Sequence, residues 1–145
     1  MLTIVAITSA GLAADLRQAV GRTHRRLRAQ VGEAHLSYPL YSVLVVLTRE
    51  GPTTPGRLAE IEGVQPPSMT RTVNCLAELG LVSKGPDPTD GRLVVVALTP
   101  AGEAEVRETR RRRDAWLTSR LARLAPDDRA VLARAAALLK EIAAS

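Results

Sequence analysis

The sequence predicts a mainly α-helical protein that carries one small β-hairpin. Apolar residues recur at helical spacing along most of the chain, and prolines stand where several helices would begin. One segment instead joins a turn rich in Pro, Asp and Gly to a run of β-branched residues, which is the pattern of a hairpin. The length of 145 residues fits one domain, and the absence of Phe predicts a core of Leu, Val, Ile and Ala.

The chain is basic, and almost all of its positive charge comes from arginine. The formal net charge is +5, and only Lys84 and Lys140 among the 20 basic residues are lysines. A basic protein favours polyanionic partners, most often nucleic acid, although coding bias alone can also raise an arginine count. Charge by itself therefore does not decide the partner.

Residue types that usually carry enzyme chemistry are sparse. Cys75 is the only cysteine, which excludes a disulfide within the chain and a cysteine-based zinc site, and favours a reducing compartment such as the cytoplasm. The two histidines, His24 and His35, lie in no catalytic motif, and no phosphate-binding loop is present. The sequence therefore predicts no enzyme, no cofactor and no metal site.

The first expected helix spans residues 12–32. Four apolar residues recur in it at helical spacing, namely Leu16, Val20, Leu27 and Val31. The apolar residues 1–14 lack the basic start of a signal peptide and are too few to cross a membrane. We interpret them as a packing arm, with a disordered leader as the alternative, and predict no membrane partner.

A second helix is expected over residues 38–50, in the segment "YPLYSVLVVLTREG". Ser37 can cap this helix, Pro39 suits its first turn, and Gly51 ends it. Its side chains are apolar nearly all round, which predicts the buried central helix of the fold.

Two shorter helices and the hairpin follow. The segment "TTPGRLAEIEG" predicts a helix with Thr54 as its cap and Pro55 at its first position. A further helix spans residues 67–79, and Gly80 closes it. The strands are expected at 81–83 and 93–98, and the wing that would contact DNA is expected at residues 83–98. This order is a winged helix-turn-helix arrangement, in which the second helix enters the major groove of DNA.

The helix at 67–79 has one apolar face and one small, polar and basic face. Met69, Val73, Leu76 and Ala77 share the core side, because they lie within one arc at 100° per residue. The predicted DNA-binding residues of this helix lie opposite or flank that arc: Pro67, Ser68, Thr70, Arg71 and Asn74. Hydroxyls can bond phosphates or bases, and an arginine can read guanine or hold a phosphate. An ordinary solvated polar face is the alternative.

The wing supplies a further basic candidate. Arg92 lies at the base of the turn, where a projecting hairpin can insert an arginine into the electronegative minor groove. The structural alternative is an ion pair between Arg92 and Asp87 or Asp90. The ion pair and the DNA contact can coexist, because an acidic partner can orient the guanidinium.

The residues "PPSMTRTVNCLAELGLV" followed by "DPTDGRLVVVALTPAGEA" resemble the multiple antibiotic resistance regulator (MarR) family of bacterial transcription factors. The helix order extends the resemblance over essentially the whole chain. The family pattern in the wing is an acidic residue, any residue, Arg, Asp, any residue, Arg. This sequence matches it at Asp87, Asp90 and Arg92 but has Thr89 in place of the first Arg, which places more weight on Arg92.

The resemblance implies a homodimer formed by residues 1–36 and 100–145, with residues 37–99 as the DNA-binding lobe. Two helices are expected in the C-terminal part, a long one after Thr99-Pro100 and a last one from Pro126 to about Ala143. Packing against residues 38–48 can absorb only some of their apolar side chains, which are Leu117, Leu121, Leu124, Val131, Leu132, Leu138, Leu139 and Ile142.

The resemblance also implies a small, often phenolic or aromatic acid ligand bound between the dimer helices and the lobe. Tyr38 matches a residue that lines this pocket in some members, with His24, Arg28 and Tyr41 as further candidates. The alternative for Tyr38 is a half-buried tyrosine at the start of a helix, without a role in ligand binding. Cys75 could sense oxidants, but a thiol without a functional role is favoured.

The predicted function is therefore a dimeric, ligand-responsive transcriptional regulator that reads a palindromic DNA site. It would use the helix at 67–79 and the wing at 83–98. A winged-helix module that binds proteins without reading DNA is the alternative, which Arg71, Arg92 and the basic charge disfavour.

Overall fold

The computed structural model describes residues 7–145 and confirms a mainly α-helical chain with one hairpin. Residues 1–6, and with them much of the predicted packing arm, lie outside this range. The elements in chain order are α1 (Ser9–Arg28), α2 (Tyr38–Glu50), α3 (Pro55–Glu62), α4 (Pro66–Glu78), β1 (Val82–Pro86), β2 (Val94–Leu98), α5 (Pro100–Leu121) and α6 (Pro126–Ala144).

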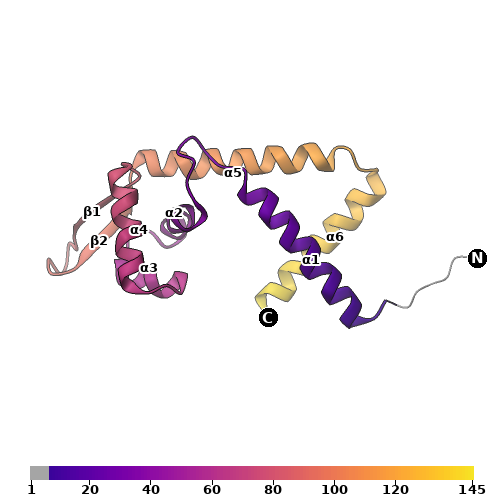
Figure 1. Cartoon of the computed structure of the whole chain (residues 1–145), viewed down its shortest axis with the longest axis horizontal. Helices are drawn as coiled ribbons and strands as arrows, with labels where there is room; N and C mark the ends of the chain where they lie inside the picture. Colours follow the sequence, from indigo (N-terminus) through magenta and orange to yellow (C-terminus); the bar gives the residue numbers. More distant parts are fainter. Residues whose placement is uncertain (1–6) are drawn as a thin grey trace, which may run out of the picture.

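The long helix α5 connects two parts of the molecule that differ in character (Figure 1). At one end, α2, α3, α4 and the hairpin form a lobe around a shared core. At the other end, α1 and α6 extend away from the lobe, and neither helix has a buried residue. None of the helices in residues 7–145 has the length and apolar character needed to cross a membrane.

The core of the lobe surrounds α2, as its apolar sequence predicts. Its fully buried apolar side chains come from α2, α3, α4, β2 and α5: Val43, Leu44, Leu58, Met69, Val73, Leu76, Val96 and Val106. Burial of a Leu or Val side chain stabilises a fold by about 1.5–3 kcal/mol relative to exposure. Helix α4 is therefore held by its core face, and its opposite face is exposed to solvent.

Threonine caps begin three of the helices. The Oγ1 atoms of Thr8, Thr54 and Thr99 accept hydrogen bonds from the backbone N–H three residues later, at 3.1, 3.2 and 3.1 Å. Ser37 occupies the cap position of α2, but its side chain makes no capping bond, so that prediction was wrong. Pro39 removes one of the two N–H groups that such a cap would use.

The first helix differs from its predicted bounds at both ends. It starts at Ser9, because Thr8 caps it, and it ends at Arg28 instead of Gly32. Residues 29–35 form a linker in which His35 has a φ of 49°. Val31 was predicted on a helical face and lies in this linker instead, because contacts with α5 hold its backbone in a different path.

The wing is an antiparallel hairpin that is longer on its first strand than predicted. Val82 pairs with Leu98 and Pro86 pairs with Val94, so β1 runs three residues past Ser83. Thr53 forms an additional bridge to Val96, with N···O distances of 3.0 and 2.7 Å. The start of α5 packs so closely on the hairpin that a Cβ on Gly102 would collide with the Leu81 carbonyl oxygen. The wing is therefore attached firmly to the lobe.

Candidate nucleic-acid interface

The exposed face of α4 contains the predicted DNA-binding residues of this helix. Met69, Val73 and Leu76 are buried against the core, as their spacing predicts. Pro67, Thr70, Arg71 and Asn74 are exposed on the other side, and Ser68 is half-buried. Cys75 is also half-buried. The first three turns of α4 thus present small, hydroxylic, amide and basic groups to solvent.

The start of α4 offers few backbone donors to an anion. Pro66 and Pro67 lack N–H groups, and the N–H groups of Ser68 and Met69 donate to the Gln65 carbonyl at 3.0 and 3.2 Å. The Thr70 hydroxyl donates to the Pro66 carbonyl at 3.0 Å. Contacts between this end of the helix and a phosphate therefore depend on side chains, above all on Arg71, and less on the helix N-terminus.

Arg71 is held only lightly in the free protein. Its Nη2 atom lies 3.5 Å from the Ser68 hydroxyl, at the limit of a hydrogen bond, and its guanidinium joins none of the ion pairs among residues 7–145. An exposed guanidinium without a carboxylate partner keeps its donors available for guanine or phosphate.

Lys84 is a basic residue at this face that the sequence reasoning missed. It lies on β1, and its Nζ donates to the Asn74 Oδ1 atom at 2.6 Å. The contact connects the wing to α4 and leaves the Asn74 amide N–H groups free to donate. Strand alternation could have placed Lys84 on an exposed face, but its pairing with Asn74 depends on how the hairpin packs against α4.

Acidic side chains shape the turn of the wing. The Asp87 Oδ1 atom accepts from the Thr89 hydroxyl and N–H, both at 2.7 Å, and from the Asp90 N–H at 3.0 Å. These bonds, the one from the Thr89 hydroxyl foremost, lower the pKa of the Asp87 carboxyl. Thr89, which replaces the first arginine of the family pattern, therefore stabilises the turn.

Arg92 projects from this turn. Its backbone N–H donates to the Asp90 carboxylate at 3.1 Å. Its guanidinium forms no ion pair with Asp87 or Asp90, and it takes part in none of the salt bridges found in the described part of the chain. The ion pair considered as the alternative role of Arg92 is therefore absent there; Asp87 accepts from Thr89 and the Asp90 N–H, and Asp90 accepts from the Arg92 N–H. Arg92 remains exposed at the rim of the wing.

The four predicted ligand residues cluster where α1, α2 and α5 meet. The Arg28 guanidinium lies 4.0 Å from the centre of the Tyr38 ring, and the His24 ring meets Tyr38 edge-on at 5.9 Å. Tyr41 is buried beneath Arg113, whose guanidinium lies 4.4 Å from its ring. Sequence reasoning missed Arg113, which is far from Tyr41 in the chain.

These side chains leave little free space. The cavity between Arg28, Tyr38, Tyr41 and Arg113 has a volume of about 10 Å³, which is room for one water molecule at most. The two arginines that cover the phenol rings close it. Arg28, Tyr38 and Tyr41 are therefore brought together around a cavity too small for a ligand, and His24 contacts the Tyr38 ring without lining it.

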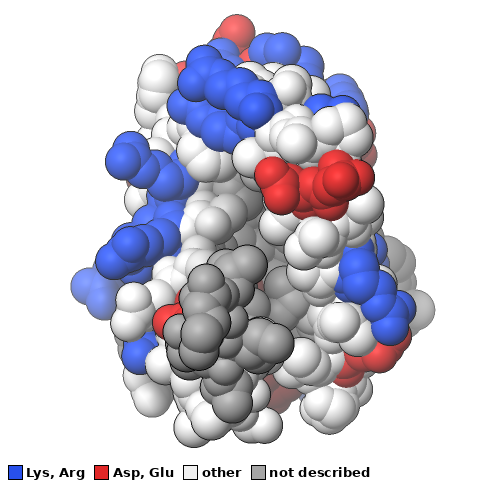
Figure 2. Space-filling view, turned by 90° about the vertical axis from the view of Figure 1, so that its right-hand side faces the viewer, with Lys and Arg blue, Asp and Glu red and all other residues white. Residues whose placement is uncertain are grey.

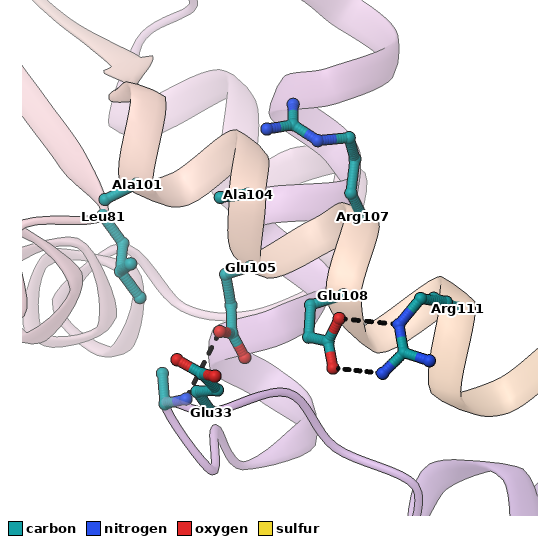
Figure 3. Close-up of a pocket in the computed structure, with 9 residues that line it drawn as sticks. Glu33, Leu81, Ala101, Ala104, Glu105, Arg107, Glu108 and Arg111 are labelled. Carbon is teal, nitrogen blue, oxygen red and sulfur yellow. Dashed lines mark hydrogen bonds and ion pairs between the residues drawn. The ribbon is translucent and has the colours of Figure 1, made fainter.

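A larger open groove of about 680 Å³ runs along α5 beside the linker. Figure 3 shows that Glu108 and Arg111 face one another in this groove, joined by two hydrogen bonds of 2.9 and 2.8 Å. Arg112 also donates to Glu108, at 2.7 Å. The bonds from Arg111 first, and then from Arg112, lower the pKa of Glu108 to about 2.

The low pKa of Glu108 predicts a pH-dependent contribution to stability. The contribution is complete above the unfolded pKa of about 4.5 and is lost as the pH falls through about 2. We expect the difference in Tm between wild type and Glu108→Gln to shrink across this range in thermal unfolding experiments. Glu103→Gln is the matched control, because the nearest arginine nitrogen to Glu103 lies 4.0 Å away. A difference for Glu108→Gln that stays constant with pH would contradict the assignment.

Comparisons with known proteins agree with the geometry of the lobe. The MarR family model matches residues 36–94, which include α2, α3, α4 and the wing turn. The HTH-type transcriptional regulator ML2140 of Mycobacterium leprae is 43% identical over 135 residues, which cover 93% of this chain and 94% of the relative. Such relatives are transcriptional regulators, in keeping with the prediction that the chain is not an enzyme.

Solved structures extend the likeness to the whole chain. RV1404 from Mycobacterium tuberculosis has a TM-score of 0.81 at 27% identity, with 97% of each chain covered. The PcaV transcriptional regulator from Streptomyces coelicolor, solved in complex with its natural ligand, has a TM-score of 0.55 at 28% identity. That likeness covers 100% of this chain and 98% of PcaV. With its winged lobe, the exposed Arg71 on α4 and its relatives of 43% identity, this chain belongs to the MarR family of helix-turn-helix transcriptional regulators.

Proposed function

We propose that the protein acts as a homodimer that reads a palindromic DNA site. The observation that carries the dimer is the exposure of apolar side chains on α1 and α6, neither of which buries a residue within one chain. The large apolar side chains exposed on these two helices are Leu12, Val20, Val131, Leu132, Leu138 and Ile142. Apolar surface on this scale marks an interaction site in a water-soluble fold.

Figure 2 looks onto the end of the molecule that α1 and α6 form, where uncharged surface lies beside separate groups of basic and of acidic side chains. In this proposal residues 1–36 and 100–145 form the dimer, and residues 37–99 form the DNA-binding lobe. A two-fold dimer pairs identical surfaces, so it presents two copies of α4 to DNA related by the same symmetry.

The DNA that the protein selects tests this proposal. Two recognition helices should fit half-sites whose centres are one helical turn apart, about 34 Å or about 10 base pairs. Sequencing duplexes recovered by the purified protein from a random library should therefore give inverted repeats at that spacing. Recovery of single half-sites alone would contradict a dimeric reader.

We further propose that a small aromatic acid regulates DNA binding through the closed cavity near Tyr38. Two phenols and two guanidinium groups surround this cavity, a combination suited to an aromatic ring that carries a carboxylate. The complex of PcaV with its natural ligand supports ligand binding in a related fold. Arg28 and Arg113 must leave the phenol rings before a ligand enters, and such a ligand weakens DNA binding only if it prefers the DNA-incompetent arrangement.

The regulatory proposal predicts a separable effect of Tyr38→Ala. Benzoate or hydroxybenzoates should weaken binding of the wild type to its selected duplex, as followed by fluorescence anisotropy. Tyr38→Ala should blunt this response and leave DNA affinity without the acid nearly unchanged, because the Tyr38 ring packs against Arg28 and His24 of α1. If none of these acids alters DNA binding by the wild type, the protein is a constitutive DNA binder.

A further inference from the structure

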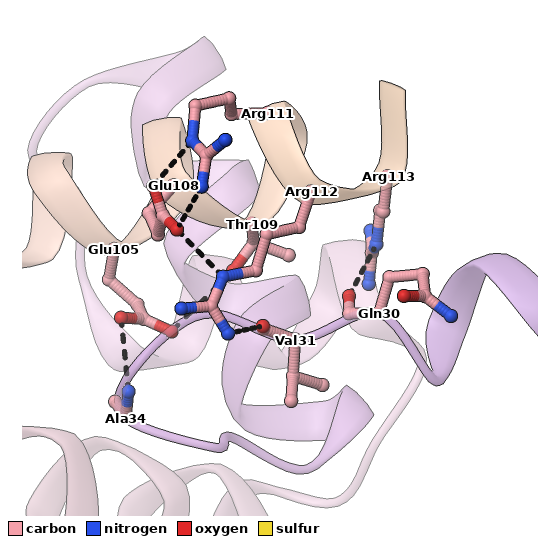
Figure 4. A network of polar contacts seen from close by, with 9 residues as sticks. All are labelled: Gln30, Val31, Ala34, Glu105, Glu108, Thr109, Arg111, Arg112 and Arg113. Atoms are coloured by element: carbon pink, nitrogen blue, oxygen red, sulfur yellow. Dashed lines mark hydrogen bonds and ion pairs between the residues drawn. The ribbon is translucent and has the colours of Figure 1, made fainter. Parts of the chain in front are cut away.

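The linker between α1 and α2 is held by three side chains of α5 (Figure 4). Arg112 Nη1 donates to the Val31 carbonyl at 3.0 Å, and Arg113 Nε donates to the Gln30 carbonyl at 3.3 Å. The Glu105 carboxylate accepts from the Ala34 N–H at 3.3 Å. Glu105, Arg112 and Arg113, with the linker residues 30–34 that they bind, are named here the linker clamp.

The linker clamp is closely packed as well as hydrogen-bonded. Glu105 and Thr109 are buried, with 7% and 2% of their surface exposed. Gly32 passes so close to them that an added Cβ would collide with the Glu105 carboxylate and lie 2.8 Å from the Thr109 hydroxyl. Only glycine fits this approach without a shift of the backbone or of a buried carboxylate.

Both arginines of the linker clamp are fixed by a second contact. Arg112 Nε donates to Glu108 at 2.7 Å, so one guanidinium joins a carboxylate of α5 to the linker. Arg113 stacks on Tyr41, which is buried in the core of the lobe. The clamp therefore connects α5, the end of α1 and the lobe at one place.

This place matters because the lobe has only two chain connections to the helices proposed to form the dimer. One is the start of α5 after β2, and the other is the linker from α1 to α2. Val106 of α5 lies in the core of the lobe, so α5 is already fixed to the lobe, and the linker clamp fixes the end of α1 against α5. The orientation of α1 relative to α4 then depends on the linker clamp.

We propose that Arg112 and Arg113 are positioning residues that set the distance and angle between the two recognition helices, and hence the half-site spacing that the protein accepts. This inference rests on the proposed dimer. Moving the half-sites by one base pair changes their separation by about 3.4 Å and their rotation by about 35°. A lobe that is held rigidly cannot turn to reach a shifted half-site, so its affinity for that DNA falls. A lobe released at the linker can turn to reach it.

Lysine substitutions test the linker clamp without changing charge. Arg112→Lys cannot span Glu108 and the Val31 carbonyl with a planar fork, and Arg113→Lys loses stacking on Tyr41. Arg111→Lys is the matched control, because Arg111 binds Glu108 in the same arginine run and has no hydrogen bond to the linker. Gly32→Ala disturbs the linker from its own side, by the collision with Glu105.

The measurement is the Kd of each variant for duplexes selected by the wild type, resynthesised with the half-sites moved by one and two base pairs in either direction. The preference is the ratio of the Kd for a shifted duplex to the Kd for the selected duplex. We expect this ratio to be at least about threefold smaller in Arg112→Lys, Arg113→Lys and Gly32→Ala than in the wild type, which corresponds to the loss of roughly one hydrogen bond. Arg111→Lys should keep the wild-type preference. Thermal unfolding and sedimentation identify the variants that remain folded dimers.

The outcomes separate this inference from the dimer on which it rests. Folded, dimeric clamp variants that keep the wild-type spacing preference overturn the positioning role alone. An equal loss in Arg111→Lys also overturns it, because that residue has no hydrogen bond to the linker. A wild-type protein that sediments as a monomer overturns the proposed dimer and the positioning role together.

Discussion

Leu138→Glu is expected to dissociate the protein into monomers and to weaken specific DNA binding by at least about a hundredfold, or about 2.7 kcal/mol. Leu138 lies on α6 with 41% of its surface exposed in the single chain. In a two-fold interface the substitution places two carboxylates against apolar surface, at roughly several kcal/mol for each buried charge. A monomer then contacts one half-site instead of two. Sedimentation equilibrium and anisotropy titration measure the two effects.

Leu79→Glu provides the matched control for this substitution. Leu79 is 50% exposed at the end of α4, away from α1 and α6, so the same charge is added outside the proposed interface. Leu79→Glu should remain dimeric at concentrations at which Leu138→Glu is monomeric. Dimers of equal stability in both variants would show that α6 does not form the interface.

Arg71→Ala is expected to cost about 1–3 kcal/mol of specific binding and to relax the sequence preference at one position in each half-site. The side chain is exposed on the first turns of α4 and is free of any ion pair within residues 7–145, so its donors can bond the O6 and N7 atoms of guanine. Titration against the selected duplex and its single-base variants measures the loss.

Arg49→Ala removes the same charge from the far end of α2, where Arg49 pairs with Glu50 at 3.0 Å. It should leave both affinity and sequence preference close to those of the wild type. If Arg71→Ala instead lowers affinity evenly for all sequences, Arg71 contacts phosphate. Unchanged binding by Arg71→Ala would place the residue outside the DNA interface.

Local signals in the sequence predicted most of the fold. A threonine cap acts on a backbone N–H three residues away, and a proline constrains its own turn, so the starts of α3 and α5 could be predicted closely. The apolar arc of α4 likewise predicted which of its side chains are buried, since helical geometry alone decides that.

The errors arose where distant segments decide the local structure. Helical spacing continued α1 as far as Gly32, but contacts with α5 hold residues 30–34 in a non-helical linker. Arg112 and Val31 are 81 residues apart, and no short-range pattern shows that they meet. The contact of Lys84 with Asn74 was missed for the same reason, because it depends on how the hairpin packs against α4.

The candidate ligand residues illustrate a further limit. The resemblance placed His24, Arg28, Tyr38 and Tyr41 near one another, and they do cluster. The volume between them depends on the rotamers of Arg28 and Arg113, which a sequence pattern cannot specify. A closed cavity of about 10 Å³ was therefore not foreseeable.

The central claim is that α4 and the wing of two chains bind one DNA duplex through basic side chains. The salt dependence of DNA binding tests this claim most directly. Arg71, Lys84 and Arg92 of each chain are the candidate phosphate or groove contacts, so several counterions should be released on binding. A plot of log Kd against log salt concentration for the selected duplex should rise linearly with a slope of about 4 to 6, at roughly 0.9 per phosphate contact. A slope near zero would contradict the account.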